Sequence, residues 1–276
     1  MLNRPRFVLC LVAGVALSVG LAFPTFAQAL PQRQIEQPPP DAVPGLIDIS
    51  GFQLFLTCVG TGIPPVILDA GGGDDSRAWR KVQPAVATLT QTCAYDRANN
   101  GYSDSRPSPD QTTALQNATE LHTLLGQAGI SGPYVLVGHS YAAAVDQVYA
   151  GQYPQDMVGL VLVDPLAGFF FRGMSHFYGE VVDFDTSREQ VEASQLPNVT
   201  LIVLTGGSGP YSPAQFLDEH RAIAARSPQG RHMIVSNSGH QIHQDQPDAV
   251  IDAIKGVLEA ALNGGAATVS LRSAAQ

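Results

Sequence analysis

Residues 134–144 read YVLVGHSYAAA, an apolar run that ends in Gly-His-Ser and continues through a tyrosine into three alanines. The apolar run predicts a buried strand over residues 134–137, and the alanine-rich stretch predicts a helix over residues 142–152. Ser140 therefore lies in a tight turn between a strand and a helix. Such a serine can simply cap the helix, or the turn can hold its hydroxyl clear of the sheet for nucleophilic chemistry.

The residues around Ser140 favour the nucleophile. A serine at such a corner needs small residues two positions before and two positions after it, because the strand and the helix crowd together there. Gly138 and Ala142 meet this demand, although glycine is the usual residue at the second position. The backbone N–H of Tyr141 would then point to the place where an oxyanion forms on the substrate.

The rest of the chain alternates between strand-like and helix-like stretches. Strands are predicted over residues 46–50, 52–59, 65–70, 92–96, 158–163, 199–204 and 232–235, and helices over residues 79–90, 111–128, 213–226 and 247–262. Apolar strands without polar alternation, each followed by a helix, indicate a parallel sheet with helices on both faces. In such sheets, ligand sites form at the carboxyl ends of the strands.

Composition favours a large folded domain. The 276 residues are 45% hydrophobic and 14% charged, with a formal net charge of −9. This is enough apolar material for a sizeable core. The sequence has no basic cluster, so we expect no nucleic-acid partner. It also has no His-Glu-x-x-His motif and no cysteine pair with metal-ligand spacing, so we expect neither a metal nor a cofactor.

The N-terminal residues predict export. Arg4 and Arg6 precede an apolar, uncharged stretch over residues 7–23, and the stretch that follows ends in Ala-x-Ala, a pattern that signal peptidases accept. We expect a signal peptide over residues 1–29, with cleavage after Ala27 as the alternative and an uncleaved membrane anchor as the competing interpretation. The mature protein would then be periplasmic or secreted, without stable membrane insertion.

Composition divides the remaining chain into three parts. Residues 30–45 are rich in proline and glutamine and predict an extended leader, and residues 263–276 predict a flexible tail. Residues 46–262 hold all the predicted strands and helices. Export would leave Cys58 and Cys93, a pair that joins in an oxidising compartment if the fold lets the two residues meet.

Two further stretches could complete a site around Ser140. Three glycines at residues 71–73 follow the third predicted strand, where backbone N–H groups can turn inward. Gly72 is the predicted second oxyanion donor, and a flexible turn is the alternative interpretation. His240 follows the last predicted strand and could take the serine proton and hand it to a leaving group, with His243 as its rival.

Together, these stretches resemble the α/β-hydrolase superfamily, in its branch of single-domain esterase-like enzymes. The motifs that carry the resemblance are PVILDAGGG (65–73), Trp79, CAYDRANNGYSDS (93–105), GPYVLVGHSYAAA (132–144), YPQDMVGLVLVDP (153–165) and SGHQIHQDQP (238–247). The resemblance covers residues 46–262. It implies a mostly parallel eight-stranded sheet with helices on both faces, an antiparallel first hairpin, and a small lid at about residues 165–197. It also places the second strand beside the fourth, and hence Cys58 beside Cys93, as a disulfide or as two buried thiols.

The sequence departs from the family pattern at two positions. Asn99 stands where the family usually has glycine, but asparagine also tolerates left-handed backbone angles. The acid of the catalytic triad usually follows the seventh strand, where this chain has Gly209. The alternatives are Asp164, at the end of the sixth strand, and Asp218, on a predicted helix. Asp164 has the better location, although an Asp-Pro pair at a strand end can simply make a turn.

The resemblance implies a serine hydrolase for a small-molecule acyl substrate, with a carboxylic ester as the first expectation. Ser140 would attack the acyl carbon, His240 would carry the proton, and Asp164 would orient His240. The backbone N–H groups of Tyr141 and Gly72 would hold the oxyanion. The alternatives are a ligand-binding or degenerate member of the fold without efficient turnover, and a cofactor-free haloperoxidase or carbon–carbon bond hydrolase with the same triad.

The predicted substrate pocket lies between the lid and the tight turn over residues 138–142, which we call the elbow. Tyr141, Phe169 and His176 are expected to line it, and the aromatic residues of the lid predict an apolar acyl or aromatic group beneath them. These aromatic residues can equally pack within the lid itself, and this is the interpretation that we favour for them. Three charged residues are interpreted as structural: Asp69, which precedes the glycines, and Asp96 and Arg97, which resemble a structural pair of the family.

Overall fold

A computed structural model of the chain describes residues 44–108, 111–166, 179–208 and 214–264. Several predictions concern residues outside these ranges: the signal peptide, nearly all of the leader and of the tail, the aromatic part of the lid with Phe169 and His176, and Gly209. Within the described residues, no helix is both long and apolar enough to cross a bilayer.

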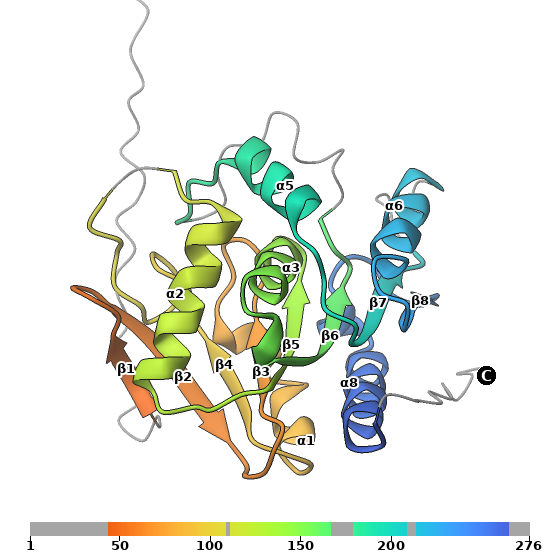
Figure 1. Cartoon of the computed structure of the whole chain (residues 1–276), viewed down its shortest axis with the longest axis horizontal. Coiled ribbons are helices and arrows are strands. Elements are labelled where there is room, and N and C mark those ends of the chain that lie inside the picture. The colour runs from red at the N-terminus through yellow and green to blue at the C-terminus, as the bar shows by residue number, and fades with distance from the viewer. Residues whose placement is uncertain (1–43, 109–110, 167–178, 209–213, 265–276) are drawn as a thin grey trace, which may run out of the picture. The chain divides into compact units, whose positions relative to one another are not determined.

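The sheet confirms the predicted fold class. Its strands are β1 (Pro44–Asp48), β2 (Gln53–Val59), β3 (Val66–Asp69), β4 (Thr92–Tyr95), β5 (Tyr134–His139), β6 (Met157–Val163), β7 (Thr200–Gly206) and β8 (Gly230–Val235). They form one eight-stranded sheet in the order β1-β2-β4-β3-β5-β6-β7-β8 (Figure 1). β2 pairs antiparallel with both β1 and β4, and all other pairs are parallel. The carboxyl ends of β3 to β8 therefore meet at one edge of the sheet.

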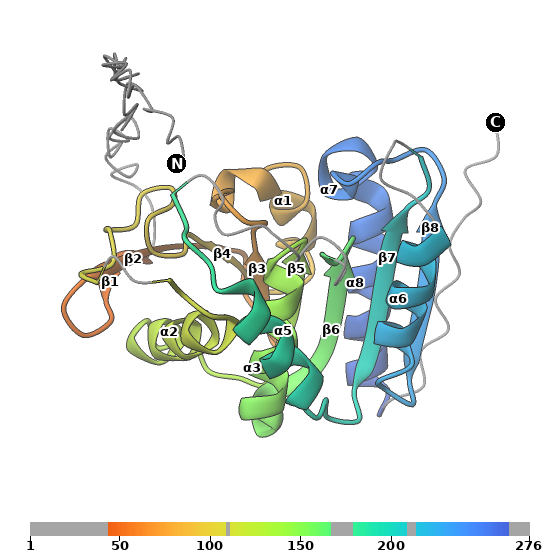
Figure 2. The same cartoon turned by 90° about the horizontal axis from the view of Figure 1, so that it is seen from above.

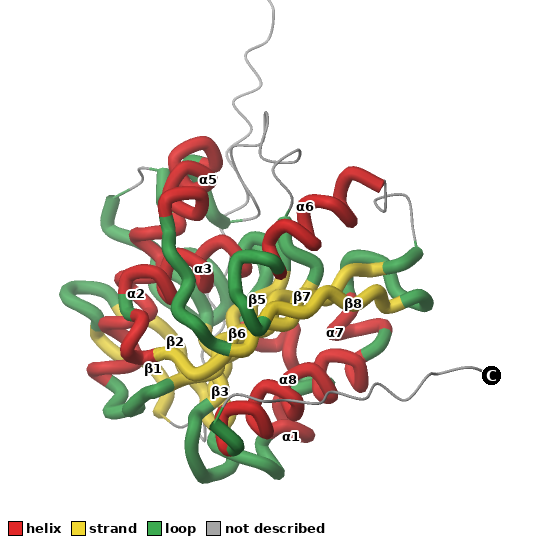
Figure 3. The backbone as a smooth tube through the Cα atoms, turned by 45° about the vertical axis from the view of Figure 1, so that its right-hand side comes forward, coloured by secondary structure: helices red, strands yellow, loops and turns green. Residues whose placement is uncertain are grey.

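Helices cover both faces of the sheet, as Figure 2 and Figure 3 show. One face carries α2 (Ala114–Gln127), α3 (Ala142–Gln152), α5 (Phe184–Ala193) and α6 (Ala214–Ala224), and the other carries α1 (Gln83–Val86), α7 (Ile242–Asp245) and α8 (Pro247–Leu262). Two buried clusters correspond to these layers: Leu121 and Val145 belong to the first, and Trp79 and Ile254 to the second. Strands buried on both faces explain the unbroken apolar runs in the sequence.

The predicted helix over residues 79–90 is much shorter in the structure. A 3-10 turn over Ser76–Trp79 is followed by the single turn of α1. Pro84 has no backbone N–H and can only begin a helix, and it stands in the first turn of α1. After Val86 the chain continues in turns with hydrogen bonds between residues close in sequence, such as the bond from the Leu89 N–H to the Val86 carbonyl at 2.9 Å.

Helix α5 was not predicted, because its sequence FDTSREQVEA is mostly polar. Asp183 caps it by accepting a hydrogen bond from the Thr186 N–H at 2.9 Å. In turn, the side chains of Ser187 and Gln190 accept hydrogen bonds from the first N–H groups of α2, at 3.0 and 2.9 Å. This part of the predicted lid is therefore packed into the helical layer.

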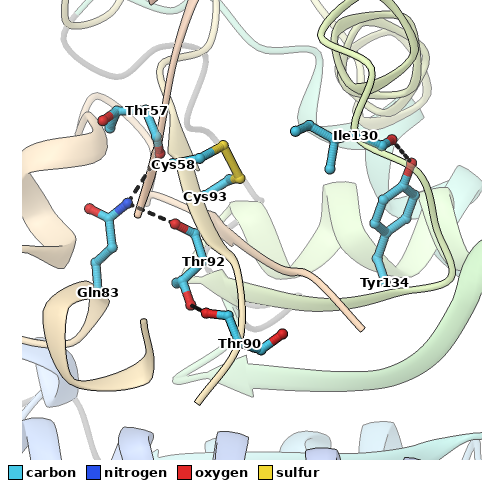
Figure 4. Close-up of a disulfide and its surroundings, with 8 residues drawn as sticks. All are labelled: Thr57, Cys58, Gln83, Thr90, Thr92, Cys93, Ile130 and Tyr134. Atoms are coloured by element: carbon cyan, nitrogen blue, oxygen red, sulfur yellow. Dashed lines mark hydrogen bonds between the residues drawn. A yellow bond between two sulfur atoms is a disulfide. The ribbon is translucent and has the colours of Figure 1, made fainter. Parts of the chain in front are cut away.

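A disulfide joins the antiparallel edge of the sheet to its parallel part. Cys58 on β2 and Cys93 on β4 are directly paired in register and are bonded to each other (Figure 4). Beside them, the Gln83 side chain donates hydrogen bonds to the carbonyls of Thr57 and Thr92, both at 3.1 Å. Of the two states that the sequence left open for these cysteines, the structure has the disulfide.

Replacing both cysteines with alanine should lower the free energy of unfolding by about 3–4 kcal/mol, because the cross-link closes a loop with a sequence separation of 35 residues. Guanidinium unfolding curves of the oxidised wild type, the reduced wild type and the double variant measure this loss. Reduced wild type and the double variant should unfold at a similar midpoint. Equal midpoints for oxidised and reduced wild type, with free thiols verified by mass, would contradict the prediction.

Candidate active site

Ser140 occupies a strained corner between β5 and α3. Its φ angle is +55°, in the left-handed region that residues other than glycine rarely adopt. The corner is held by hydrogen bonds from the Ser140 N–H to the Val163 carbonyl at 3.0 Å and from the Leu166 N–H to the Ser140 carbonyl at 3.1 Å. The backbone of the serine is thus tied to β6 and to the chain that follows it.

The small residues around this corner are required by close packing. A Cβ atom on Gly138 would lie 2.4 Å from Oδ2 of Asp146 and 2.9 Å from the carbonyl group of Ala142. No side chain fits there unless α3 moves away from β5. Ala142 is itself fully buried, so a larger residue would push the same two elements apart.

His240 connects Ser140 to an acidic side chain. Its Nε2 lies 2.9 Å from Oγ of Ser140, and its Nδ1 lies 2.7 Å from Oδ2 of Asp164. The three residues follow β5, β6 and β8, so the common edge of the sheet brings them together. The side chain of His240 is 36% exposed and that of Asp164 is 15% exposed, which leaves the histidine accessible to a ligand.

Asp164, and not Asp218, is the carboxylate in contact with His240. Asp164 has a φ angle of +45°, and its Oδ1 accepts a hydrogen bond from the Gly206 N–H at 2.8 Å. Its other oxygen is therefore directed at the imidazole. Asp218 lies on α6 with a 77% exposed side chain, and it pairs with Arg221 at 3.0 Å.

A chain of hydrogen bonds that was not foreseen from the sequence supports the backbone beside Asp164. Nε2 of His220 lies 2.8 Å from the Pro165 carbonyl, so it must carry the proton and donate. Its Nδ1 then accepts from the hydroxyl of Thr205 at 2.6 Å, and that hydroxyl accepts from Nε2 of His232 at 2.8 Å. Burial lowers the pKa of His220 and keeps its ring neutral. Nothing in the sequence distinguishes His220 from any other helical histidine.

The rival histidine, His243, contacts neither Ser140 nor Asp164 by a hydrogen bond within the described residues. It is buried between the rings of Trp79 and His139, with ring centroids at 4.9 and 4.4 Å. Burial lowers its pKa to about 4, so the ring is neutral near pH 7. His139 anchors the loop of His240, because its Nε2 lies 2.9 Å from the His240 carbonyl.

The glycine-rich turn lies beside this cluster. Gly72 is half-buried in the turn that follows β3. A Cβ atom on its neighbour Gly71 would lie 2.7 Å from Nδ1 of His139, the residue before Ser140. The turn therefore approaches the elbow as closely as a backbone without side chains allows.

The side chain of Tyr141, which is predicted to line the substrate pocket, does not face an open space in the structure. It is fully buried, and Phe184 packs edge-on against it with a centroid separation of 5.7 Å. Its hydroxyl accepts a hydrogen bond from the Asn117 side chain at 3.1 Å. The ring therefore packs into the interior below the elbow, because α2 and α5 cover it.

Comparison with known proteins gives consistent results. A family model described as "alpha/beta hydrolase fold" matches residues 64–190. An uncharacterized protein of Bacillus subtilis, YqjL, is 31% identical over 207 residues, which are 68% of this chain and 81% of YqjL. A thermophilic esterase from Thermogutta terrifontis superposes with a TM-score of 0.60 at 21% identity, covering 78% of this chain and 98% of the esterase. A putative epoxide hydrolase from Pseudomonas aeruginosa superposes with a TM-score of 0.64 at 16% identity, covering 80% and 98%. At these identities the structural similarity shows the fold.

Adding one methyl group at the elbow, in a Gly138→Ala variant, should lower the free energy of unfolding by about 1–3 kcal/mol, because β5 and α3 must separate to accept it. The matched control is Gly126→Ala on α2, where an added Cβ meets nothing within 4 Å. That variant should be neutral or more stable by about 0.5–1 kcal/mol, since alanine is the better helix former. Thermal unfolding of both variants makes the comparison, and equal effects would show that the elbow is not tightly packed.

Proposed function

This chain belongs to the alpha/beta hydrolase family, and on that premise we propose that it is a serine hydrolase that cleaves carboxylic esters with Ser140, His240 and Asp164. One observation carries the proposal. A single imidazole lies 2.9 Å from the serine oxygen on one side and 2.7 Å from a carboxylate on the other. This is the arrangement of nucleophile, base and orienting acid that acyl transfer requires.

The geometry supports a two-step mechanism. The carboxylate of Asp164 accepts the Nδ1 proton of His240, which leaves the Nε2 lone pair facing the hydroxyl of Ser140. As Oγ of Ser140 attacks the acyl carbon, its proton passes to Nε2, and His240 then gives that proton to the departing alkoxide. A water molecule repeats the sequence on the acyl-enzyme: it loses a proton to Nε2, and Ser140 leaves with that proton as the acid is released.

The oxyanion of each tetrahedral intermediate needs N–H donors. We assign this role to the backbone N–H groups of Tyr141 and Gly72, which lie in the elbow and in the adjacent glycine turn. One such donor contributes about 3–4 kcal/mol to the stabilisation of the transition state in enzymes of this kind. The pocket residues Phe169 and His176 stay predictions.

The location of Asp164 removes the reason for preferring a degenerate, non-catalytic member of the fold. That alternative was based on the missing acid at Gly209, and a carboxylate from the neighbouring strand contacts His240 instead. An ester is favoured over an amide because its leaving group needs less protonation. No feature of the described residues favours a haloperoxidase or a carbon–carbon bond hydrolase, and a substrate screen would distinguish them.

A fluorophosphonate probe should label wild-type protein at Ser140 and should not label Ser140→Ala or His240→Ala variants, because the hydroxyl reacts only when the imidazole takes its proton. Peptide mapping by mass spectrometry identifies the labelled residue, and circular dichroism verifies that the variants are folded. Heat-denatured wild type serves as the control without an assembled site. If folded wild type takes up no label, the hydrolase proposal is wrong.

An Asp164→Asn variant should lower kcat for an ester by about 10³- to 10⁴-fold with little change in KM, because the amide no longer favours the productive tautomer of His240. The matched control is Asp218→Asn, which removes an exposed carboxylate that contacts Arg221. Its kcat should stay within about twofold of wild type. A larger loss in Asp218→Asn than in Asp164→Asn would reverse the assignment of the acid.

A further inference from the structure

Arg97, in the DRANNGYS stretch after β4, has a buried guanidinium group with many partners. It donates to the Ala70 carbonyl at 2.5 Å and to the Gly71 carbonyl at 2.7 Å, and it also contacts the carboxylate of Asp69. Both carboxylate oxygens of Glu180 accept from it, at 2.8 and 2.9 Å. The guanidinium group thus holds two consecutive carbonyls of the glycine-rich turn.

Glu180 is the partner that balances the charge of Arg97. Its side chain is 1% exposed, and burial alone would raise its pKa. The positive charge of Arg97 and the hydrogen bond from the Gly73 N–H outweigh burial, so that the pKa of Glu180 is lowered. Burial raises the pKa of Asp69 in spite of the same arginine. An ionised Glu180 therefore lets the arginine remain buried next to the turn.

The hydrogen bonds of Arg97 also determine which way the next N–H group points. The Gly71–Gly72 peptide is trans, so the carbonyl of Gly71 and the N–H of Gly72 point in opposite directions. Because Arg97 and the Asp74 N–H hold the Gly71 carbonyl, the N–H of Gly72 must face away from the buried guanidinium. The N–H of Gly73 is already bonded to Glu180, at 3.1 Å.

The same arginine contacts the other side of the site. Its Cζ atom lies 5.6 Å from the centre of the Tyr141 ring, in a cation–π arrangement. Arg97 therefore touches the two segments to which we assign the oxyanion donors. A shift of the guanidinium group would move the glycine turn relative to the elbow.

Close packing on one side of Glu180 and backbone hydrogen bonds on the other fix its position. Gly179 has a φ angle of +83°, and a Cβ atom there would lie 2.7 Å from the Asn99 carbonyl. On the other side, the Val181 carbonyl accepts from the Thr112 N–H, and the Asp183 N–H donates to the Thr112 carbonyl, both at 2.8 Å. Glu180 is thus carried by backbone that is anchored to the loop after β4 and to the start of α2.

We propose that Glu180 is a positioning residue: by neutralising and orienting Arg97, it aims the Gly72 N–H at the acyl oxygen of the substrate. This inference rests on the proposed function, because it needs Gly72 to be an oxyanion donor. In this proposal, Glu180 contacts neither the substrate nor the proton that His240 transfers. Its effect is confined to the stabilisation of the oxyanion, which gives the test a specific readout.

The chain contains a matched control pair. Arg106 and Glu120 form a second two-point ion pair, at 2.9 and 2.6 Å, with side chains that are only 6% and 13% exposed. Arg106 lies in the loop after β4 and Glu120 lies on α2. Neither side chain forms a hydrogen bond with the glycine turn within the described residues. Arg106 also donates to Oδ1 of Asn117 at 3.1 Å, and Asn117 donates to the Tyr141 hydroxyl. Glu120→Gln therefore removes a comparable charge that has no direct contact with the glycine turn or with the backbone of Tyr141.

The experiment compares acylation of Ser140 by 4-nitrophenyl acetate and by its thiono analogue, in which sulfur replaces the carbonyl oxygen. Donors placed for an oxyanion accelerate the oxygen ester far more than the sulfur one. In Glu180→Gln, acylation by the oxygen ester should fall by about 10- to 100-fold, and the preference for oxygen over sulfur should shrink by a similar factor. Glu120→Gln should keep the wild-type preference.

A second variant guards against misfolding of Glu180→Gln. Glu180→Asp keeps the negative charge but is too short to reach both Arg97 and the Gly73 N–H, so it should fold and show a smaller loss of the oxygen preference. An unchanged preference in a folded Glu180 variant, with wild-type protein that labels at Ser140, overturns the role of Glu180 alone. Wild-type protein that neither labels nor acylates overturns the proposed function and this inference with it.

Discussion

The crowded contact between β5 and α3 is the constraint on which the rest of the site depends. Gly138 lies so close to α3 that no side chain fits, and Ser140 must adopt a positive φ angle to turn the chain between the two elements. This turn places the serine hydroxyl above the carboxyl edge of the sheet. Because the parallel strands all end at that edge, the segments that follow β6 and β8 bring Asp164 and His240 to the same place.

The site also depends on charges that the fold buries. Arg97, Asp69 and Glu180 are almost fully inaccessible, and such a group is stable only when each charge has a partner and its polar atoms are hydrogen-bonded. Here the partners of Arg97 include the carbonyls of Ala70 and Gly71. The hydrogen bonds that stabilise the buried arginine therefore also fix the conformation of the glycine turn.

A carboxylate can contact His240 from the strand next to the one that the resemblance implies. Asp164 follows β6 and not β7, yet β6 and β7 are neighbours, and the Gly206 N–H at the end of β7 donates a hydrogen bond to its Oδ1. Asp164 has a positive φ angle, and two hydrogen bonds hold this backbone in place: from His220 to the Pro165 carbonyl and from the Asp164 N–H to the Leu204 carbonyl. The carboxylate therefore reaches His240 from the adjacent strand.

Much of this protein follows from local pattern alone. The strands, the helices over Ala142–Gln152 and Pro247–Leu262 and the elbow around Ser140 can be predicted because apolar periodicity and small residues at a turn are local properties. His240 is a candidate because it follows the last predicted strand. The choice of Asp164 over Asp218, the pairing of Cys58 with Cys93, and the contacts of Glu180 and His220 depend on which residues meet across the sheet. Nothing in the polar segment after β6 marks Glu180 as a buried residue or α5 as the cap of α2. Only the tertiary structure decides these contacts, because they join residues that are far apart in the chain and leave no periodic trace in the sequence.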